Sequence, residues 1–150
     1  MKKIIVIVIF CFLILSTASA DYLDDFNIYA VVFGAPEISE GTESIANGET
    51  VTDYSSAGCR IIFFEADNHL KSVTVIGTGN PFLSYCAAAI MQIDPSSDNR
   101  TMNYGSLLSA YLLAIADDTG EDHIAMTVSG AVMGIHKAGE EYVFIISVVN

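Results

Sequence analysis

The 150-residue sequence is poor in positive charge. It holds 6 Lys and Arg residues against 18 Asp and Glu residues, which gives a formal net charge of −12 at pH 7. Nucleic-acid binding depends on Lys and Arg side chains that neutralise phosphates, and the anionic surface of a membrane repels a protein of this charge. The composition therefore argues against nucleic acids as partners and indicates a solvated, acidic surface.

The sequence also lacks a hydrophobic run long enough to span a bilayer, which takes about 20 apolar residues. Its long apolar run, Ile4 to Leu15, follows Lys2 and Lys3 and ends at small residues. Ala18 and Ala20 occupy the A-x-A positions of a cleavage site. We therefore predict a signal peptide; the alternative is an uncleaved membrane anchor.

Cleavage after Ala20 would divide the chain into a signal peptide, 1–20, and a mature protein, 21–150. The length of the mature chain fits a single domain with its own core. We expect no membrane span after cleavage, and a protein that is secreted or lies on the exterior of the cell envelope, in the periplasm if the host has one. The positively charged residues that remain after the cut are Arg60, Lys71, Arg100 and Lys137.

Cysteine is scarce as well. Cys11 lies inside the predicted signal peptide, so the mature chain keeps Cys59 and Cys86. Export would place this pair in a compartment where disulfides persist, and an even number leaves no unpaired thiol. We predict a Cys59–Cys86 disulfide. The alternative is two buried thiols that never meet, because free cysteine is itself a common core residue.

A β-hairpin is predicted from Cys59 to Gly77. Two runs of β-branched and aromatic residues flank Asp67 and Asn68, residue types that tolerate the backbone angles of a tight turn. A turn centred there would place Cys59 opposite Ile76, at the open end of the hairpin. Cys59 would then lie near the helix that follows, which carries the second cysteine.

Two helices are predicted in the middle of the chain. The first begins at Asn80, a helix N-cap residue, and its spacing puts Cys86 on the buried face. The second, Tyr104 to Ile115, has one apolar stripe, and its other face is small or apolar rather than charged, so we expect it to be mostly buried. The polar loop between them, Ser96 to Asn103, carries a possible glycosylation site at Asn99.

The N-terminal part of the mature chain is harder to assign. Phe26 to Gly34 is rich in β-branched and aromatic residues, which predicts a strand. The following segment, Gly34 to Gly58, is polar and rich in turn-forming residues. Asn47 and Gly48 favour a short hairpin within it; the alternative is a long loop of the kind that is often functional.

Two strands are predicted at the C-terminal end, on either side of a turn near Ala138 and Gly139. This turn would place His136 opposite Glu141 as an exposed cross-strand ion pair. The last strand is apolar on both faces, as expected for a central strand that is covered on both sides. The predicted fold class is α+β: mainly an antiparallel sheet of hairpins packed against two central helices.

No motif for catalysis, phosphate binding or metal binding is present. The chain lacks a G-x-S-x-G elbow, a phosphate-binding loop and the spacing of a calcium loop, and His69, His123 and His136 are dispersed. His123 and His136 lie an odd number of residues apart on one predicted strand, so we expect their side chains on opposite faces. We predict no cofactor and no metal.

We expect a non-catalytic exported binding or interaction module whose ligand is an unknown protein or small molecule; its apolar second helix also allows a homo-oligomer. Two alternatives stay open. One is an inhibitor-like envelope protein that inserts the segment Gly34 to Gly58 into a partner. The other is a small secreted enzyme whose site is assembled only in three dimensions, for which the candidate residues are His136, Glu141, Glu65 and Tyr104.

Overall fold

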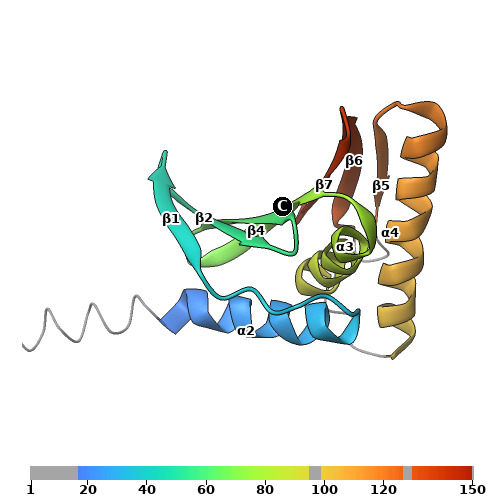
Figure 1. The fold of residues 1–150 in the computed structure, drawn as a ribbon. Coiled ribbons are helices and arrows are strands. Elements are labelled where there is room, and N and C mark those ends of the chain that lie inside the picture. The colour runs from blue at the N-terminus through green and yellow to red at the C-terminus, as the bar shows by residue number, and fades with distance from the viewer. Residues whose placement is uncertain (1–16, 95–98, 127–129, 150) are drawn as a thin grey trace, which may run out of the picture.

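The computed structural model describes residues 17–94, 99–126 and 130–149. These residues form a seven-stranded antiparallel sheet, in the order β1-β2-β3-β4-β7-β6-β5, and three helices (Figure 1). The predicted α+β class is confirmed. The elements are α2 (Thr17–Val32), β1 (Gly41–Ala46), β2 (Glu49–Ser56), β3 (Cys59–Ala66), β4 (His69–Gly77), α3 (Gly79–Ile93), α4 (Asn99–Thr119), β5 (His123–Met126), β6 (Val132–Ala138) and β7 (Glu141–Ser147).

Tight turns with left-handed backbone join the first four strands. Asn47 and Gly48 have φ angles of 57° and 84°, and Asp67 and Asn68 have φ angles of 55° and 61°. Positive φ at both turn positions gives a turn whose twist matches that of the flanking strands. The hairpin predicted at Asn47 is confirmed, and β1 and β2 occupy most of the segment 34–58 in place of a long loop.

A bulge at Lys71 in β4 changes the register of the β3–β4 hairpin, because Phe64 pairs with Ser72 and Glu65 pairs with Leu70. The pairing shifts between Phe64 and Glu65, and beyond the shift Arg60 lies opposite Ile76. The predicted pairing of Cys59 with Ile76 is therefore wrong by one residue. Turn chemistry fixes the register only as far as the first irregularity of the ladder.

Helix α2 replaces the strand that was predicted from Phe26 to Gly34, and that prediction is wrong. The residue types favour β structure, but such propensity yields to tertiary packing. Phe26 and Ala30, one helical turn apart, are both fully buried, whereas Ile28 is 60% exposed. Burial at helical spacing therefore decides the conformation of this segment.

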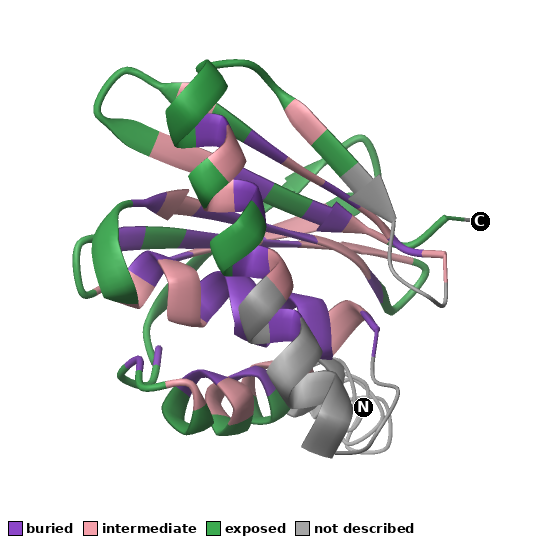
Figure 2. Ribbon diagram, turned by 90° about the vertical axis from the view of Figure 1, so that its right-hand side faces the viewer, coloured by how far each residue is buried: buried purple, intermediate pink, exposed green. Residues whose placement is uncertain are grey.

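The three helices pack on the same side of the sheet (Figure 2). Helix α3 lies against β4 and β7, and α2 and α4 flank it. Three aromatic rings join the layers: the ring centroid of Phe26 in α2 lies 5.2 Å from that of Phe63 in β3 and 6.1 Å from that of Tyr85 in α3. The hydrophobic core therefore lies between the helices and one face of the sheet.

Helix α4 is longer than predicted and only partly buried. Leu112 and Ala116 are buried, but Tyr111 is 62% exposed. The expectation of a mostly buried helix is therefore wrong for the side of α4 that Tyr111 occupies. The small residues on that side, such as Ala110 and Ala114, are exposed to solvent instead of packing against a further layer of structure.

The possible glycosylation site also lies in a different setting from the one predicted. Asn99 is the first residue of α4, not part of a loop. Residues 95–98, which precede it, and the side chain of Asn99 lie outside the described residues. Glycosylation of Asn99 stays a prediction.

Most of the predicted signal peptide, residues 1–16, lies outside the described residues, and 17–20 form the first turn of α2. Cleavage after Ala20 would remove that turn and keep Phe26 and Ala30, the buried contacts of α2. No helix in the described part of the chain is long and apolar enough to cross a membrane.

Candidate functional site

One face of the sheet has no helix packed on it in the part of the chain that the structure describes. The helices all contact the other face, and the side chains on the uncovered face come from β2 to β7. We call this surface the open face. Its apolar side chains and neighbours include Val51, Ile62, Phe64, Thr74, Ile76, Ile124, Val132, Gly134, His136, Val143 and Ile145, and the polar residues Asp53, Ser55, Arg60, Ser72 and Ser147 lie on the same face.

The register of the strands arranges the open face as rows of neighbouring side chains. One row runs through Ile62, Thr74, Ile145, Gly134 and Ile124, which are paired in this order across five strands. Directly opposite residues have Cβ atoms about 4.5–5.5 Å apart. Thr74, in β4, is 8% exposed, whereas Ile145 in β7 is 45% and Ile124 in β5 is 78% exposed. The row is therefore a continuous, mainly apolar surface that becomes more accessible toward β5.

A hollow of about 160 Å³ lies at the β5 end of this row. Its apolar side chains include Ile124, Val143 and Ile145, and Gly134 contributes no side chain. A Cβ added at Gly134 would have its nearest neighbour, the carbonyl oxygen of His123, at 3.5 Å, which is an ordinary contact. The hollow therefore exists partly because residue 134 is glycine.

A histidine–carboxylate pair lies at one end of the hollow. Nδ1 of His136 contacts Oδ1 of Asp122, and the two side chains are 55% and 70% exposed. The predicted pair of His136 with Glu141 is wrong, because the turn brings Ala138 opposite Glu141 and Val143 opposite His136. The exposed pair gives the hollow a polar rim.

His123 belongs to the other face of the sheet. It is opposite the buried residue Ile135, and its Nε2 lies 2.7 Å from Oγ1 of Thr119 at the end of α4. The single strand predicted to hold both histidines is wrong, because His123 lies in β5 and His136 in β6, two paired strands. Their side chains nevertheless lie on opposite faces, since His136 points to the open face. Their side chains therefore do not form one site, although the backbone of His123 also borders the hollow at Gly134.

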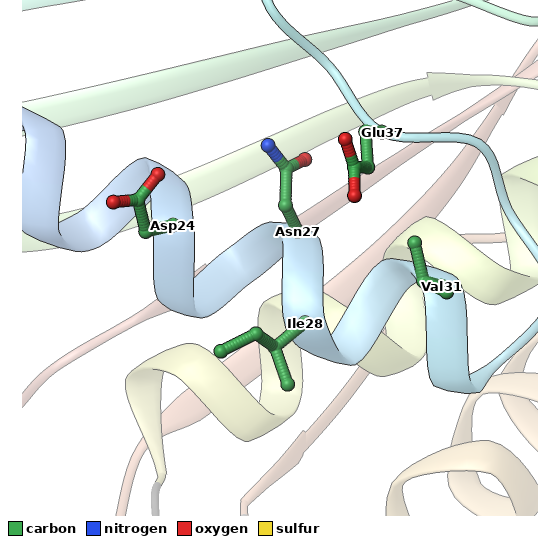
Figure 3. A pocket seen from close by; sticks show the side chains of 5 residues that line it. All are labelled: Asp24, Asn27, Ile28, Val31 and Glu37. Carbon is green, nitrogen blue, oxygen red and sulfur yellow. The ribbon is translucent and has the colours of Figure 1, made fainter.

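A second hollow, of about 470 Å³, lies between α2 and the segment that follows it (Figure 3). Asn27 joins the two walls, because its side-chain amide donates to the carbonyl oxygen of Ile38 at 2.8 Å and accepts from the N–H of Ile38 at 2.9 Å. Asp24 and Glu37 remain as charged groups, so this hollow could hold a cation or an amine but offers no nucleophile. Its lining residues are Asp24, Asn27, Ile28, Val31 and Glu37.

A third hollow, of about 460 Å³, surrounds the turn between β2 and β3. It contains the only thiol that lines any of these three hollows, but Cys59 is 2% exposed and burial raises its pKa. A thiol with a raised pKa is a poor nucleophile at neutral pH. Arg60 is already held by Asp53. The lining residues are Ser55, Ser56, Ala57, Gly58, Cys59, Arg60 and Glu141, none of which is a histidine.

The predicted Cys59–Cys86 disulfide is not formed in the structure, where both residues are buried free thiols. The bulge in β4 shifts the pairing so that Cys59 lies beside Gly77, where an added Cβ would lie 2.6 Å from the Cys59 Sγ atom. Cys86 lies in the buried face of α3, and burial raises the pKa of its thiol well above the usual range. The alternative of two buried thiols describes this structure.

The candidate residues for catalysis are dispersed. His136 lies on the open face of β6, and Glu141 is the first residue of β7, three residues beyond the end of β6. Glu65 lies in β3, opposite Thr50 of β2, in the other half of the sheet. The side chain of Tyr104 is outside the described residues. The structure therefore does not bring His136, Glu141 and Glu65 to one site.

A polar cluster that the sequence analysis missed ties α4 to the sheet. Asp117 accepts hydrogen bonds from the Tyr142 hydroxyl at 2.6 Å and from Lys137 Nζ at 2.9 Å. These two bonds, that of Tyr142 first, lower the pKa of Asp117. Asp117 lies beyond Ile115, where the predicted helix ends, but it belongs to the last turn of α4. All three partners already bind one another, which indicates a structural contact.

The segment 34–40 packs against the protein instead of projecting from it. Ala35 is 4% and Ile38 is 2% exposed, and the hydroxyl of Tyr85 donates to the carbonyl oxygen of Pro36 at 2.8 Å. The remainder of the segment Gly34 to Gly58 forms β1, β2 and their turns. An inhibitor-like insertion loop would need a protruding segment there.

Comparisons of this chain with protein-family models, with curated protein sequences and with solved structures found no match. The geometry of its surfaces is therefore the basis for proposing a function.

Proposed function

We propose that the protein is a non-catalytic, exported binding module that receives a partner protein on the open face. The observation that carries this proposal is the row from Ile62 to Ile124, which crosses five strands and is covered by none of the described helices. Contiguous exposed apolar surface is typical of an interaction site. Export rests on the predicted signal peptide.

The size of the hollow favours a protein partner over a small ligand. Pockets for small molecules usually enclose about 300–1,000 Å³, whereas the hollow at Gly134 measures about 160 Å³. This volume suits one or two side chains of a partner. His136 and Asp122 border the hollow, as polar groups border the apolar centre of protein interfaces.

Substitutions at Gly134 test the proposal because they change the hollow without removing any contact. Gly134→Val should fill the hollow and prevent a partner side chain from entering. A β-branched residue also suits a strand better than glycine, so the variant should be at least as stable as the wild type. Gly134→Ala adds a single methyl group and serves as the graded control.

The measurement is co-purification of mildly extracted, tagged protein from its own host, with the bound mass read by native mass spectrometry. We expect a partner protein with the wild type, less of it with Gly134→Ala and none with Gly134→Val. Equal recovery with all three chains would contradict the assignment to the open face. A small molecule in place of a protein would contradict the choice of partner class.

A further inference from the structure

The edge strand β1 has no strand paired to its outer side among the residues that the structure describes. β1 lies at the end of the strand order and pairs with β2. Ala46 and Glu49 close the two-residue turn, so alternate residues from Ala46 backward make the ladder bonds to β2. The N–H and C=O groups of Gly41, Glu43 and Ile45 therefore point away from the sheet.

β1 has few of the features that usually protect an edge. All 6 of its residues are exposed, it contains neither Pro nor Lys, and its pairing with β2 is continuous. Figure 1 shows it at the outer end of the sheet, away from α3 and α4. The opposite edge strand, β5, has 4 residues and contacts α4. An exposed, regular edge is a template for pairing with another strand.

The surroundings of β1 carry negative charge. The first Lys or Arg that follows residue 3 in the sequence is Arg60, and it is already paired with Asp53. Glu43 lies within β1, and Glu40 and Glu49 flank it. Pairing β1 with a second copy of itself would bring these carboxylates together, and like charges across strands are destabilising. A strand that carries Lys or Arg would be attracted instead.

We propose that the edge of β1 binds an extended basic segment of a partner protein by strand addition. Main-chain bonds to Gly41, Glu43 and Ile45 would supply affinity. Glu43 and Ile45 point to the same face of the strand. They therefore select a Lys or Arg beside Glu43 and an apolar residue two positions away, beside Ile45. This surface is separate from the open face, and the proposal does not rest on the proposed function.

Glu65 provides independent support for an excess of negative charge here. Its carboxyl lies partly buried in β3, and burial raises its pKa, with Glu43 raising it further. A cation that binds beside Glu43 would offset this repulsion.

The probe is a fluorescein-labelled peptide of alternating Lys and Val, six residues long. The control probe has the same sequence with every backbone amide N-methylated, so that it keeps the charge but cannot donate main-chain hydrogen bonds. Fluorescence anisotropy should show binding of the first peptide at least tenfold tighter than of the second. Hydrogen exchange should slow at Glu43 and Ile45. Equal binding of both peptides, or protection elsewhere, would overturn the proposal.

Two variants locate the site. Ile45→Pro removes an outward N–H that is not part of the ladder to β2, and should weaken peptide binding at least tenfold. Glu43→Gln keeps the backbone and should weaken binding about two- to fivefold, as expected for one exposed charge pair. Gly134→Val alters the open face and should leave peptide affinity unchanged. Unaltered affinity in both β1 variants would overturn the proposal.

Sedimentation of the protein alone tests whether a second copy of the chain, instead of a basic partner, pairs with the edge of β1. We expect a monomer at all concentrations used for peptide binding. A concentration-dependent dimer that protects the amides of Glu43 and Ile45 would assign the edge to a second copy of the chain and contradict a basic partner.

Discussion

At the scale of single residues, three partly or fully buried groups carry most of the testable chemistry: the carboxyl of Glu65 and the thiols of Cys59 and Cys86. Burial raises the pKa of each. In every case the folded protein favours the neutral form, because a charge is poorly solvated there. None of the three has the activating neighbours of a nucleophile or a general base.

Glu65→Gln should stabilise the protein at neutral pH. Because the folded state has the higher pKa, it binds the proton more tightly than the unfolded chain does, and stability falls as the pH rises from the ordinary glutamate value of about 4.3 through the folded pKa. The Gln side chain does not ionise, so the variant avoids this loss of stability. Its free energy of unfolding should exceed that of the wild type at pH 7 and equal it below about pH 4.

Urea denaturation at both pH values measures the effect of Glu65→Gln. The matched control is Glu140→Gln, in the exposed turn before β7, which should change the free energy of unfolding little at either pH. Destabilisation by Glu65→Gln at pH 7 would show that the charged form of Glu65 is favoured in the folded protein.

The thiols give a second prediction. Cys59 and Cys86 should resist alkylation in the folded protein, since both are buried and protonated. After unfolding without reductant, both should react. A chain cleaved after Ala20 lacks Cys11, so mass spectrometry should find two alkyl groups on it. If neither thiol reacts in the unfolded, unreduced chain, the predicted Cys59–Cys86 disulfide is present and this account of two free thiols is wrong.

At the scale of elements, the sequence predicts what local chemistry decides. Asn47 with Gly48, and Asp67 with Asn68, specify their turns by themselves, and both hairpins are present. Helix α2 was not predictable in this way, because its β-rich composition is overridden by contacts of Phe26 with residues far along the chain. The bulge in β4 has no comparable local pattern, so the pairing of Cys59 with Ile76 was predicted wrongly.

Phe26→Ala tests the packing of α2. The side chain is fully buried between Phe63 and Tyr85, so its loss should destabilise the protein by about 3–5 kcal/mol. The matched control on the same helix is Ile28→Ala, where the side chain is 60% exposed and the change should be within about 0.5 kcal/mol. Chemical denaturation of both variants provides the comparison. Similar losses for the two variants would contradict the burial pattern of α2.

At the scale of the whole molecule, the arrangement of layers determines the candidate site. The last strand is apolar on both faces, and it was expected to be covered on both. β7 is indeed central, between β4 and β6, but the described helices cover one face, and Ile145 is 45% exposed on the other. The apolar residues on both faces of β7 were thus the sequence signal for an apolar open face. The sequence could not show which side the helices would leave uncovered.

The central claim is that the open face contacts a partner protein, and site-specific photo-crosslinking tests it most directly. A benzophenone amino acid would replace Ile124, which is 78% exposed on the open face, or Ile28, which is 60% exposed on α2. The two sites offer similar exposure on different surfaces. After irradiation in the native host, we predict an adduct with another protein from position 124 and none from position 28. An adduct from position 28 alone, or none from position 124, would contradict the claim.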